Sequence, residues 1–568
     1  MNRFHARRAA FGQPAAGFVS QPEPRTIGRV ARGRQLCAGN FLFGGQVVEA
    51  PDTAIWDLKM PSARFEEELH GFTWLDDLAA TGDVRARRCA QQWTTGWIEK
   101  FGNGTGPGWV PASTGRRVIR WINHAIFLQN AQEREASEAY YRSLGHQTIF
   151  LSRRWHVTQP GVPRFEALTG LIYSGLALIG MESHVGPAIS ALAKECDEQI
   201  DKDGGIPSRN PEELLEIFTL LNWASSALSE AGKIPPKPIL NAIERMAPTL
   251  RALRHADGGL ARFHGGGRGL EGRLDHALAS SGVRTPPGPG LAMGFARLSA
   301  GRTSVIVDVA APPTGVLERN AHASTLAIEV TSGRRPLVVN CGSGVPFGDE
   351  WAKAGRATAS HSVLEIEGYS SSRFEAQKRL GQSSRDFLAD VPKDVRMRQN
   401  NDTGGVGLMA GHDGYAPTHG LTHVRAIDLS VDGRGMAGDD TIATVSTDNN
   451  RVFDAVQDRL KLQGIPFHIR FHLHPEVDAE VDLGGAAISL ALKSGEIWIF
   501  RHDGIAEMSL QPSVYLEKGR LRPRATKQIV LSARAIEYAT RIRWTLAKAQ
   551  DTPSHVRDLE RDDRDMLS

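Results

Sequence analysis

The sequence predicts an α+β multidomain protein in which a helical half precedes an antiparallel β-sandwich. Between about residues 60 and 256 the apolar residues recur at helical spacing, and from about residue 301 they alternate with a period of two. The intervening residues 257–300 are rich in Gly and Pro. With 568 residues, 41% hydrophobic and 23% charged, the composition is that of a globular protein with a large core and excludes a disordered or collagen-like chain.

Helices are predicted along most of the first half. Residues 116–130 place Val118, Ile122, Ala125, Ile126 and Gln129 on one stripe that must be buried. Short links between successive helices predict antiparallel hairpins, arranged as a solenoid or a curved α/α toroid, and the absence of a fixed-period repeat argues against the solenoid. Further segments with helical spacing lie at 64–80, 84–101, 133–156, 163–181, 187–202, 211–231 and 238–255.

The second half consists of short β-branched runs separated by turn signals, such as TSVIVDVA, STLAIEV, PLVVN, HSVLEIEG and KQIVLSA. This alternation is typical of a β-sandwich. Before these runs, DGGLARFHGGGRGLEGR and RTPPGPG are too rich in Gly and Pro to hold a helix. We therefore expect residues 257–300 to form a linker and crossing loop.

The two ends of the chain carry opposite charge. Residues 1–35 hold seven arginines against the single acid Glu23, whereas the last 18 residues hold six acids and three arginines. We expect a basic disordered arm rather than a nucleic-acid or lipid contact, and a charged tail. The expected domains are the arm 1–35, the helical domain 36–256, the linker 257–300, the sandwich 301–548 and the tail 549–568.

The apolar runs, the N-terminal arm and the cysteine spacing argue against several protein classes. The longest uncharged apolar run, residues 168–181, is shorter than the about 18 to 20 residues that cross a bilayer, so no membrane insertion is expected. The arm lacks the apolar core and cleavage site of a secretory signal, which favours the cytoplasm. The four cysteines show no CxxC spacing, so neither a disulfide framework nor a thiolate zinc site is indicated.

Histidines at the starts of predicted strands are candidates for a metal site. His322 shares its strand face with Leu326 and Ile328, and His361 begins a later strand. Nitrogen donors from separate strands can converge on a divalent cation such as Zn²⁺, which commonly takes three protein ligands at an accessible site. Hydrogen-bonded structural histidines are the alternative.

The Gly-rich linker concentrates positive charge. Guanidinium groups match carboxylates and sulfates in bidentate fashion, so a substrate with repeated anions is one reading and a plain surface loop the other. No dinucleotide or P-loop fingerprint is present. Glu213 and Glu216 follow DGGIPSRNP at a helix start, where acids suit the helix dipole, although paired carboxylates could also serve a hydrolase. The candidate substrate-binding residues of the linker are Arg254, Arg262, His264 and Arg268.

Taken in order, WINHAIFLQN, DGGIPSRNP, HADGGLARFHGGGRG, AHASTLAIEV, PLVVNCGSG and RATASHSVLEIEG resemble the heparinase II/III-like family across nearly the whole chain. The resemblance implies an α/α toroid, an incomplete helical barrel, followed by an antiparallel β-sandwich. It also implies an acidic, uronate-containing polysaccharide bound between the two and cleaved by β-elimination.

The same resemblance exposes changes at the catalytic positions. In active relatives the toroid supplies an Asn or His together with a Tyr, and the sandwich supplies a His. Here Glu213 stands nearest the place of the tyrosine. The histidine of the usual HxHxD stretch falls on Asn320, which leaves His322 at the second position and Ser324 at the third.

The residues at the family's structural metal site differ from the family pattern less than those at the catalytic positions do. Its ligands would map to His322, to Asn340 in place of an aspartate, and to His361. An Asn oxygen binds a cation more weakly than a carboxylate does. A zinc or other divalent ion would fix the neighbouring strands and take no part in catalysis.

Three functional hypotheses follow. In the first, a lyase, Arg209 and Arg262 hold the uronate carboxylate, Tyr415 or a nearby histidine removes the proton, and Asn320 assists. In the second, the fold serves a carbohydrate-binding accessory protein without turnover. In the third, Glu213 or Glu216, paired with another acid, serves an α/α-toroid glycoside hydrolase. The resemblance ranks the lyase first and points to a periplasmic setting, while the polysaccharide and the oligomeric state stay open.

Overall fold

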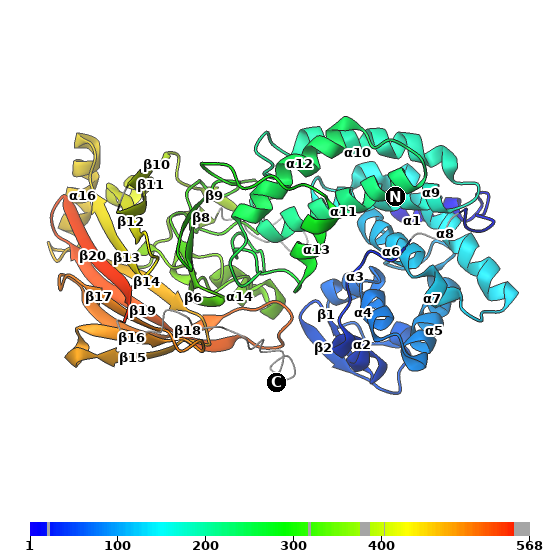
Figure 1. The fold of residues 1–568 in the computed structure, drawn as a ribbon, viewed down its shortest axis with the longest axis horizontal. Helices are drawn as coiled ribbons and strands as arrows, with labels where there is room; N and C mark the ends of the chain where they lie inside the picture. The colour runs from blue at the N-terminus through cyan, green and yellow to red at the C-terminus, as the bar shows by residue number, and fades with distance from the viewer. Residues whose placement is uncertain (20–22, 316–317, 319, 375–386, 403, 550–568) are drawn as a thin grey trace. The chain divides into compact units, whose positions relative to one another are not determined.

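The computed structural model describes residues 1–19, 23–315, 318, 320–374, 387–402 and 404–549. The chain divides into two compact units (Figure 1). The helical unit consists of Met1–Ile206, Leu215–Ala247 and His276–Thr285. The β unit consists of Pro207–Leu214, Pro248–Asp275 and Pro286–Ser568, so two short pieces of the helical half belong to it.

Local signals set the helix ends in the helical unit. Asp83 caps α5 by accepting a hydrogen bond from the backbone N–H of Ala86 at 2.7 Å, and Gly82 ends the preceding helix in the left-handed conformation. The helices are α1 (Asn2–Ala9), α2 (Val30–Cys37), α3 (Ala63–His70), α4 (Trp74–Thr81), α5 (Val84–Phe101), α6 (Pro111–Asn123), α7 (Ala125–Gln129), α8 (Arg134–Arg154), α9 (Val162–Ala177), α10 (Val185–Gln199), α11 (Pro211–Glu230), α12 (Lys237–Ala252) and α13 (Arg273–Ser280); β1 (Asn40–Phe43) and β2 (Gln46–Glu49) form a hairpin.

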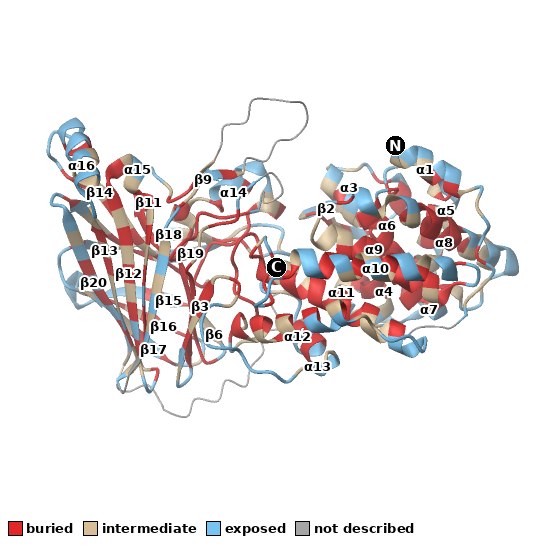
Figure 2. Ribbon diagram, turned by 90° about the horizontal axis from the view of Figure 1, so that it is seen from above, coloured by how far each residue is buried: buried red, intermediate tan, exposed pale blue. Residues whose placement is uncertain are grey.

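Helix α6 lies at the centre of this unit and is buried almost throughout (Figure 2). It packs against α9 through two glycines. A Cβ atom added to Gly170 would lie 2.7 Å from the Cα atom of Gly115, so only glycine allows the two backbones to approach this closely. The predicted burial of the 116–130 stripe is confirmed at Val118, Ile122 and Ala125. It is wrong at Ile126, which is 64% exposed, because α6 ends at Asn123 and α7 begins a new helix at Ala125.

The β unit contains two large antiparallel sheets. One follows the order β10 (Val395–Asp402), β11 (Gly405–Tyr415), β12 (Leu421–Ser430), β13 (Gly435–Ala443), β20 (Ala539–Lys548), β17 (Ile497–His502), β16 (Ala487–Ala491), β15 (Asp478–Asp482). The other follows β18 (Glu507–Tyr515), β19 (Arg524–Ala535), β14 (Ile465–Leu473), β6 (Arg335–Val339), β5 (Ile328–Ser332), β4 (Thr303–Asp308), β3 (Phe295–Ala300), with β7 (Leu364–Ile366) paired to β14. Strands β8 (Arg373–Phe374) and β9 (Leu388–Asp390) pair separately, and α14 (Asp349–Ala354), α15 (Ala416–His419) and α16 (Thr447–Arg459) connect strands.

The two sheets share an apolar core. Phe471 on β14 contacts Phe500 and Trp544 of the opposite sheet, with ring centroids 5.0 and 4.8 Å apart. The side chains alternate along β12 and β14 between buried and partly exposed, which is the pattern of a strand that turns one face to a core. The predicted order of a helical half and then a β-sandwich is therefore confirmed.

Two local expectations are wrong. Residues 1–35 include α1 and the start of α2, and Ala6 and Ala9 are buried because α1 packs on α8, so the arm is not disordered there. The linker holds α13, because Arg273–Ser280 offers eight residues without Gly or Pro. Residues 550–568 of the predicted tail lie outside the described residues. None of the helices in the described chain is both long and apolar enough to span a membrane.

Candidate functional site

The sequence-predicted site residues all belong to the β unit. Arg209 lies just before α11 with its side chain directed into the interior. It donates to Asp308 at 2.5 Å and to the carbonyl oxygens of Met293, Gly294, Ala310 and Ala311 at 2.9–3.2 Å. Burial would raise the pKa of Asp308, but the Arg209 guanidinium and His264 bring it down to about 2. The guanidinium thus serves a structural ion pair and has no donor left for a uronate carboxylate.

Three histidines from the linker and the sandwich meet beside this ion pair. His264 lies 3.4 Å from Asp308 and accepts a hydrogen bond from the backbone N–H of His322. His361 donates from Nδ1 to the carbonyl oxygen of Ala357 at 2.8 Å, so its Nε2 accepts from Nδ1 of His322 at 3.0 Å. Burial, followed by the neighbouring His361, holds the pKa of His322 well below 6.5. His322 and His361, both predicted as metal ligands, form a buried hydrogen-bonded pair.

Asn340 is the third residue that the family resemblance assigns to the metal site. Its Oδ1 accepts the backbone N–H of Ser362 at 2.9 Å, and its Nδ2 has no hydrogen-bond partner among the described residues. An aspartate here would turn a second oxygen to the position of that amide nitrogen, whereas an NH₂ group cannot bind a metal. Two histidine nitrogens fall short of a zinc ligand set, so the donors present do not fit the family's metal. No group of three or more His, Cys, Asp or Glu suited to a metal occurs in the part of the chain that the structure describes.

Tyr415, predicted as the base, ends strand β11 in the interior. The side chain is fully buried, and its hydroxyl donates to the carbonyl oxygen of Leu364 at 3.1 Å. Burial raises the pKa of Tyr415 well above 10. This placement leaves no path by which the hydroxyl could reach a polysaccharide.

Glu213 and Asn320 are the predicted catalytic residues that reach the surface. Glu213 lies in the first turn of α11, which Asn210 caps through its Oδ1. Burial raises the pKa of Glu213. Asn320 is exposed, and Gly265 lies against it: a Cβ atom added there would be 3.0 Å from that of Asn320.

Of the three linker arginines predicted to bind substrate, one is hydrogen-bonded inside the protein and two are partly exposed. Arg262 donates to the carbonyl oxygens of Asn340, Cys341 and Leu516 at 3.0–3.2 Å and lies over the Tyr515 ring, so it is structural. Arg254 pairs with Asp275 with 37% of its side chain exposed, and Arg268 pairs with Asp257 with 46% exposed. These two retain access to an external anion.

Two buried carboxylates near the predicted site were not predicted from the sequence. Asp308 ends β4, and Glu329 lies on β5 between apolar residues. Each was visible as an acidic residue inside an otherwise apolar strand, which signals a buried charge with a partner. The partners, Arg209 and His255, lie too far away in sequence to be read from spacing.

The comparisons with known proteins identify the class to which this fold and site belong. The family model "Heparinase II/III-like, C-terminal" matches residues 283–545. FtsZ-localized protein C of Caulobacter vibrioides (strain NA1000 / CB15N) is 30% identical over 555 residues, covering 96% of this chain and 92% of that protein. The chain belongs to the heparinase II/III-like family.

Solved structures share this fold. Heparinase III superposes with a TM-score of 0.69 at 12% identity, covering 96% of this chain and 89% of that chain. A heparan sulfate lyase HepC mutant from Pedobacter heparinus gives a TM-score of 0.58 at 14% identity, covering 97% and 88%. The predicted architecture, a helical toroid followed by a β-sandwich, is confirmed.

Proposed function

We propose that this chain is a polysaccharide-binding accessory protein on a lyase fold, without β-elimination activity, and that it associates with FtsZ. The second of the three sequence hypotheses is thereby preferred to the lyase. The observation that carries the proposal is the interior position of Tyr415, whose hydroxyl is occupied by the Leu364 carbonyl.

β-Elimination requires a group that neutralises the carboxylate, a base and an acid, all within reach of one sugar. Arg209 and Arg262, proposed for the first role, donate to backbone carbonyls and to Asp308. His322 is buried and hydrogen-bonded to His361. Asn320 and Glu213 remain accessible, but an amide cannot transfer the proton that a histidine would.

Anion binding requires fewer functional groups than catalysis does. Arg254 and Arg268 keep more than a third of their side chains exposed on the linker. Their guanidinium groups could pair with carboxylates along a glycan chain without any proton transfer. Loss of the catalytic groups is therefore compatible with retained binding of an acidic polysaccharide.

The association with FtsZ rests on the relative from Caulobacter vibrioides, whose name places that protein with FtsZ. Because 30% identity extends over 96% of this chain, we extend the same association to it.

A glycoside hydrolase is the second candidate, and one observation favours it. Burial and then the neighbouring Glu213 raise the pKa of Glu318 to about 7, which suits a general acid. Glu213 would be its partner carboxylate.

One experiment separates these functions. The full-length protein is incubated with alginate, heparin, hyaluronate and polygalacturonate while ultraviolet absorbance and reducing ends are followed, and binding to each polymer is measured by affinity electrophoresis. We expect retarded migration with at least one polymer and neither product signal. New absorbance would establish a lyase, reducing ends alone a hydrolase, and lack of binding to any polymer would overturn the proposal. Co-sedimentation with FtsZ polymers tests the association, and an unchanged supernatant would refute it.

A further inference from the structure

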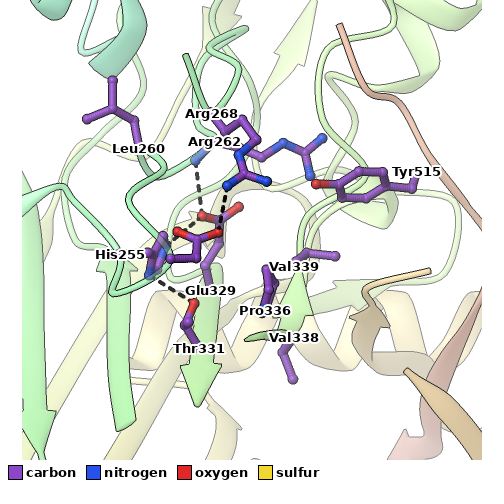
Figure 3. A pocket seen from close by; sticks show the side chains of 11 residues that line it. His255, Leu260, Arg262, Arg268, Glu329, Thr331, Pro336, Val338, Val339 and Tyr515 are labelled. Atoms are coloured by element: carbon purple, nitrogen blue, oxygen red, sulfur yellow. Dashed lines mark hydrogen bonds and ion pairs between the residues drawn. The ribbon is translucent and has the colours of Figure 1, made fainter. Parts of the chain in front are cut away.

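The cavity beside Glu329 in the β unit is too small for any ligand larger than water (Figure 3). Oε2 of Glu329 accepts from His255 at 3.1 Å and from the backbone N–H of Arg262 at 3.0 Å, whereas Oε1 has no hydrogen-bond partner in the described chain. The cavity has a volume of about 20 Å³, which gives room for one water molecule to donate to that oxygen. A larger partner of the β unit must therefore bind at its surface.

Exposed apolar side chains gather at the end of the β unit where α16 lies. Helix α16 is itself largely exposed (Figure 2). The apolar side chains lie on the connection before α16, on the turn after it, and on the connection between β19 and β20. Single exposed apolar residues are ordinary, whereas a contiguous group of them marks an interaction surface. We call this group the α16 patch; it consists of Val445, Leu460, Leu462, Ile536 and Tyr538, of which Leu462 and Ile536 are 71% and 65% exposed.

Short contacts join the three segments into one surface. The backbone N–H of Thr444 donates to the carbonyl oxygen of Tyr538 at 2.8 Å, which places Val445 beside the β19–β20 connection. A Cβ atom added to Gly464 would lie 3.0 Å from Cγ1 of Ile536, so the turn after α16 packs against the same connection. The α16 patch is therefore continuous across segments that are distant in sequence.

The turn after α16 holds Leu462 in solvent in an unfavourable backbone conformation. Lys461 and Leu462 have φ angles of 54° and 59°, in the left-handed region where bulky side chains are uncommon. The turn is nevertheless fixed, because Gln457 accepts the backbone N–H of Leu462 on its carbonyl oxygen at 2.9 Å and that of Gly464 on Oε1 at 3.2 Å. Nε2 of Gln457 donates to the carbonyl oxygen of Ala535 at 2.7 Å. A hydrogen-bonded turn thus presents the leucine side chain.

The connection between β19 and β20 is equally unusual for an exposed loop. It consists of Ile536, Glu537 and Tyr538, all of them exposed. Turn residues are usually Gly, Pro, Asn, Asp or Ser. Tyrosine is enriched at protein interfaces, because its ring packs while its hydroxyl stays hydrogen-bonded. This composition indicates contact with another protein surface.

Charged side chains around the α16 patch indicate which surface that is. Two acids and two bases are exposed there, and none of the four forms an ion pair with another residue of the described chain. A patch that carries both signs equally can pair with its own copy, whereas a patch of one sign would repel it. The four residues are Asp458, Arg459, Lys461 and Glu537.

We propose that the α16 patch is the interface of a twofold-symmetric homodimer. Leu462 of one copy packs against Ile536 of the second copy, and Lys461 forms an ion pair with Glu537 of the second copy. A twofold axis repeats each contact, so both sets of apolar side chains leave water together. Removal of Leu462 from water offsets the unfavourable backbone conformation that presents it.

Sedimentation equilibrium of the full-length protein tests the dimer. The mass of the wild type should rise with concentration from that of one chain towards that of two. Leu462→Asn should weaken association at least about tenfold, because Asn tolerates the left-handed conformation but removes the apolar contact. Leu483→Asn is the matched control, since Leu483 is also an exposed leucine with a φ of 50° but lies between β15 and β16. This control should associate like the wild type.

Charge reversal tests the contact between Lys461 and Glu537. Lys461→Glu and Glu537→Lys each place like charges opposite one another, so each variant alone should associate at least about tenfold more weakly than the wild type. An equimolar mixture of the two variants should associate again, because a heterodimer pairs opposite charges at both positions. Recovery in the mixture also shows that both variants are folded.

Three results would overturn the homodimer. The first is a wild type that stays monomeric at the highest concentration reached. The second is a Leu462→Asn variant that associates as well as Leu483→Asn, or a mixture of charge variants that associates no better than either one alone. The third is a monomeric wild type whose co-sedimentation with FtsZ is lost in Leu462→Asn and kept in Leu483→Asn, which would assign the α16 patch to FtsZ instead.

Discussion

The helical unit and the β unit have different interiors. In the helical unit the core is an aromatic cluster in which Trp97 contacts Phe72 and Trp121, and even the buried Arg117 lies over the Trp97 ring at 4.0 Å. The helical unit also has ion pairs, such as Asp76 with Arg120 at 3.3 Å, in which 9% and 6% of the side chains stay exposed. The interior of the β unit carries ion pairs that are buried more completely, such as Asp440 with Arg425 at 2.8 Å, with 0% and 1% exposed. We infer that ion pairs between buried charged residues of the β unit connect its strands and loops. A cation or histidine there is consequently weak evidence of catalysis.

Breaking the most buried ion pair should give the largest effect on stability. Asp440 accepts hydrogen bonds from His423, Arg425 and Trp544, all buried. In Asp440→Ala the Arg425 charge loses its counter-ion, which should cost about 3–5 kcal/mol. Urea unfolding checks this, with the exposed Asp478→Ala on β15 as the control. A loss no larger than that of the control would show that the charged interior is not stabilising.

Acid should weaken the β unit through its buried carboxylates. The pKa of Asp308 is lowered to about 2, so its stabilising effect is fully present above the ordinary value of 3.8 and is lost as the pH falls through 2. The difference between the pKa of 3.8 in the unfolded chain and about 2 in the folded protein corresponds to about 2.5 kcal/mol of unfolding free energy. Hydrogen exchange of β4 and β5 between pH 5 and pH 2 measures it. Asp308→Asn should remove this loss of stability with falling pH, whereas the exposed Asp478→Asn should retain it.

The order of the two halves could be predicted because burial imposes periodicity on the sequence. The local errors have local causes. Helix α1 was missed because its polar composition gives no helical stripe, whereas the fold holds it through contacts such as that of Asn2 with Arg154, 152 residues away. Helix α13 was missed because the surrounding Gly and Pro outweighed eight compatible residues.

The candidate site was less predictable because residue type does not reveal the partner. Arg262 looks like an anion binder, yet its acceptors include Asn340 and Leu516, 78 and 254 residues away. His322 and His361 were predicted on strands, but both precede them, because β5 begins at Ile328 and β7 at Leu364. Their hydrogen bond therefore depends on loop conformation, which strand spacing does not show. The free oxygen of Glu329 was not predictable either, because it depends on which of its two oxygens the neighbours occupy.

A single substitution should convert the histidine cluster into a metal site. Asn340→Asp supplies the carboxylate oxygen that the amide withholds from His322 and His361. Without metal the variant should be less stable, because it buries a charge. With Zn²⁺ at ten times the dissociation constant it should regain about 1.4 kcal/mol. Thermal unfolding with and without Zn²⁺ measures this.

The control for this prediction is Asn340→Asp combined with His361→Ala, which should show no response to Zn²⁺. A wild-type protein that is stabilised equally by Zn²⁺ would show that Asn340 does bind the ion and that our interpretation of its amide orientation is wrong.

The smallest expected effect on stability is that of Tyr415→Phe. This variant tests whether the buried hydroxyl is structural or catalytic. Tyr415→Phe removes one buried hydrogen bond to Leu364, so it should cost about 1 kcal/mol of stability. Polymer binding in affinity electrophoresis should not change, because the ring stays in the core. Tyr538→Phe, whose hydroxyl contacts Asp454 at the surface, is the matched control and should leave stability nearly unchanged. Loss of polymer binding in a folded Tyr415→Phe variant would place this hydroxyl at the ligand, and the accessory function would then have to give way to a lyase.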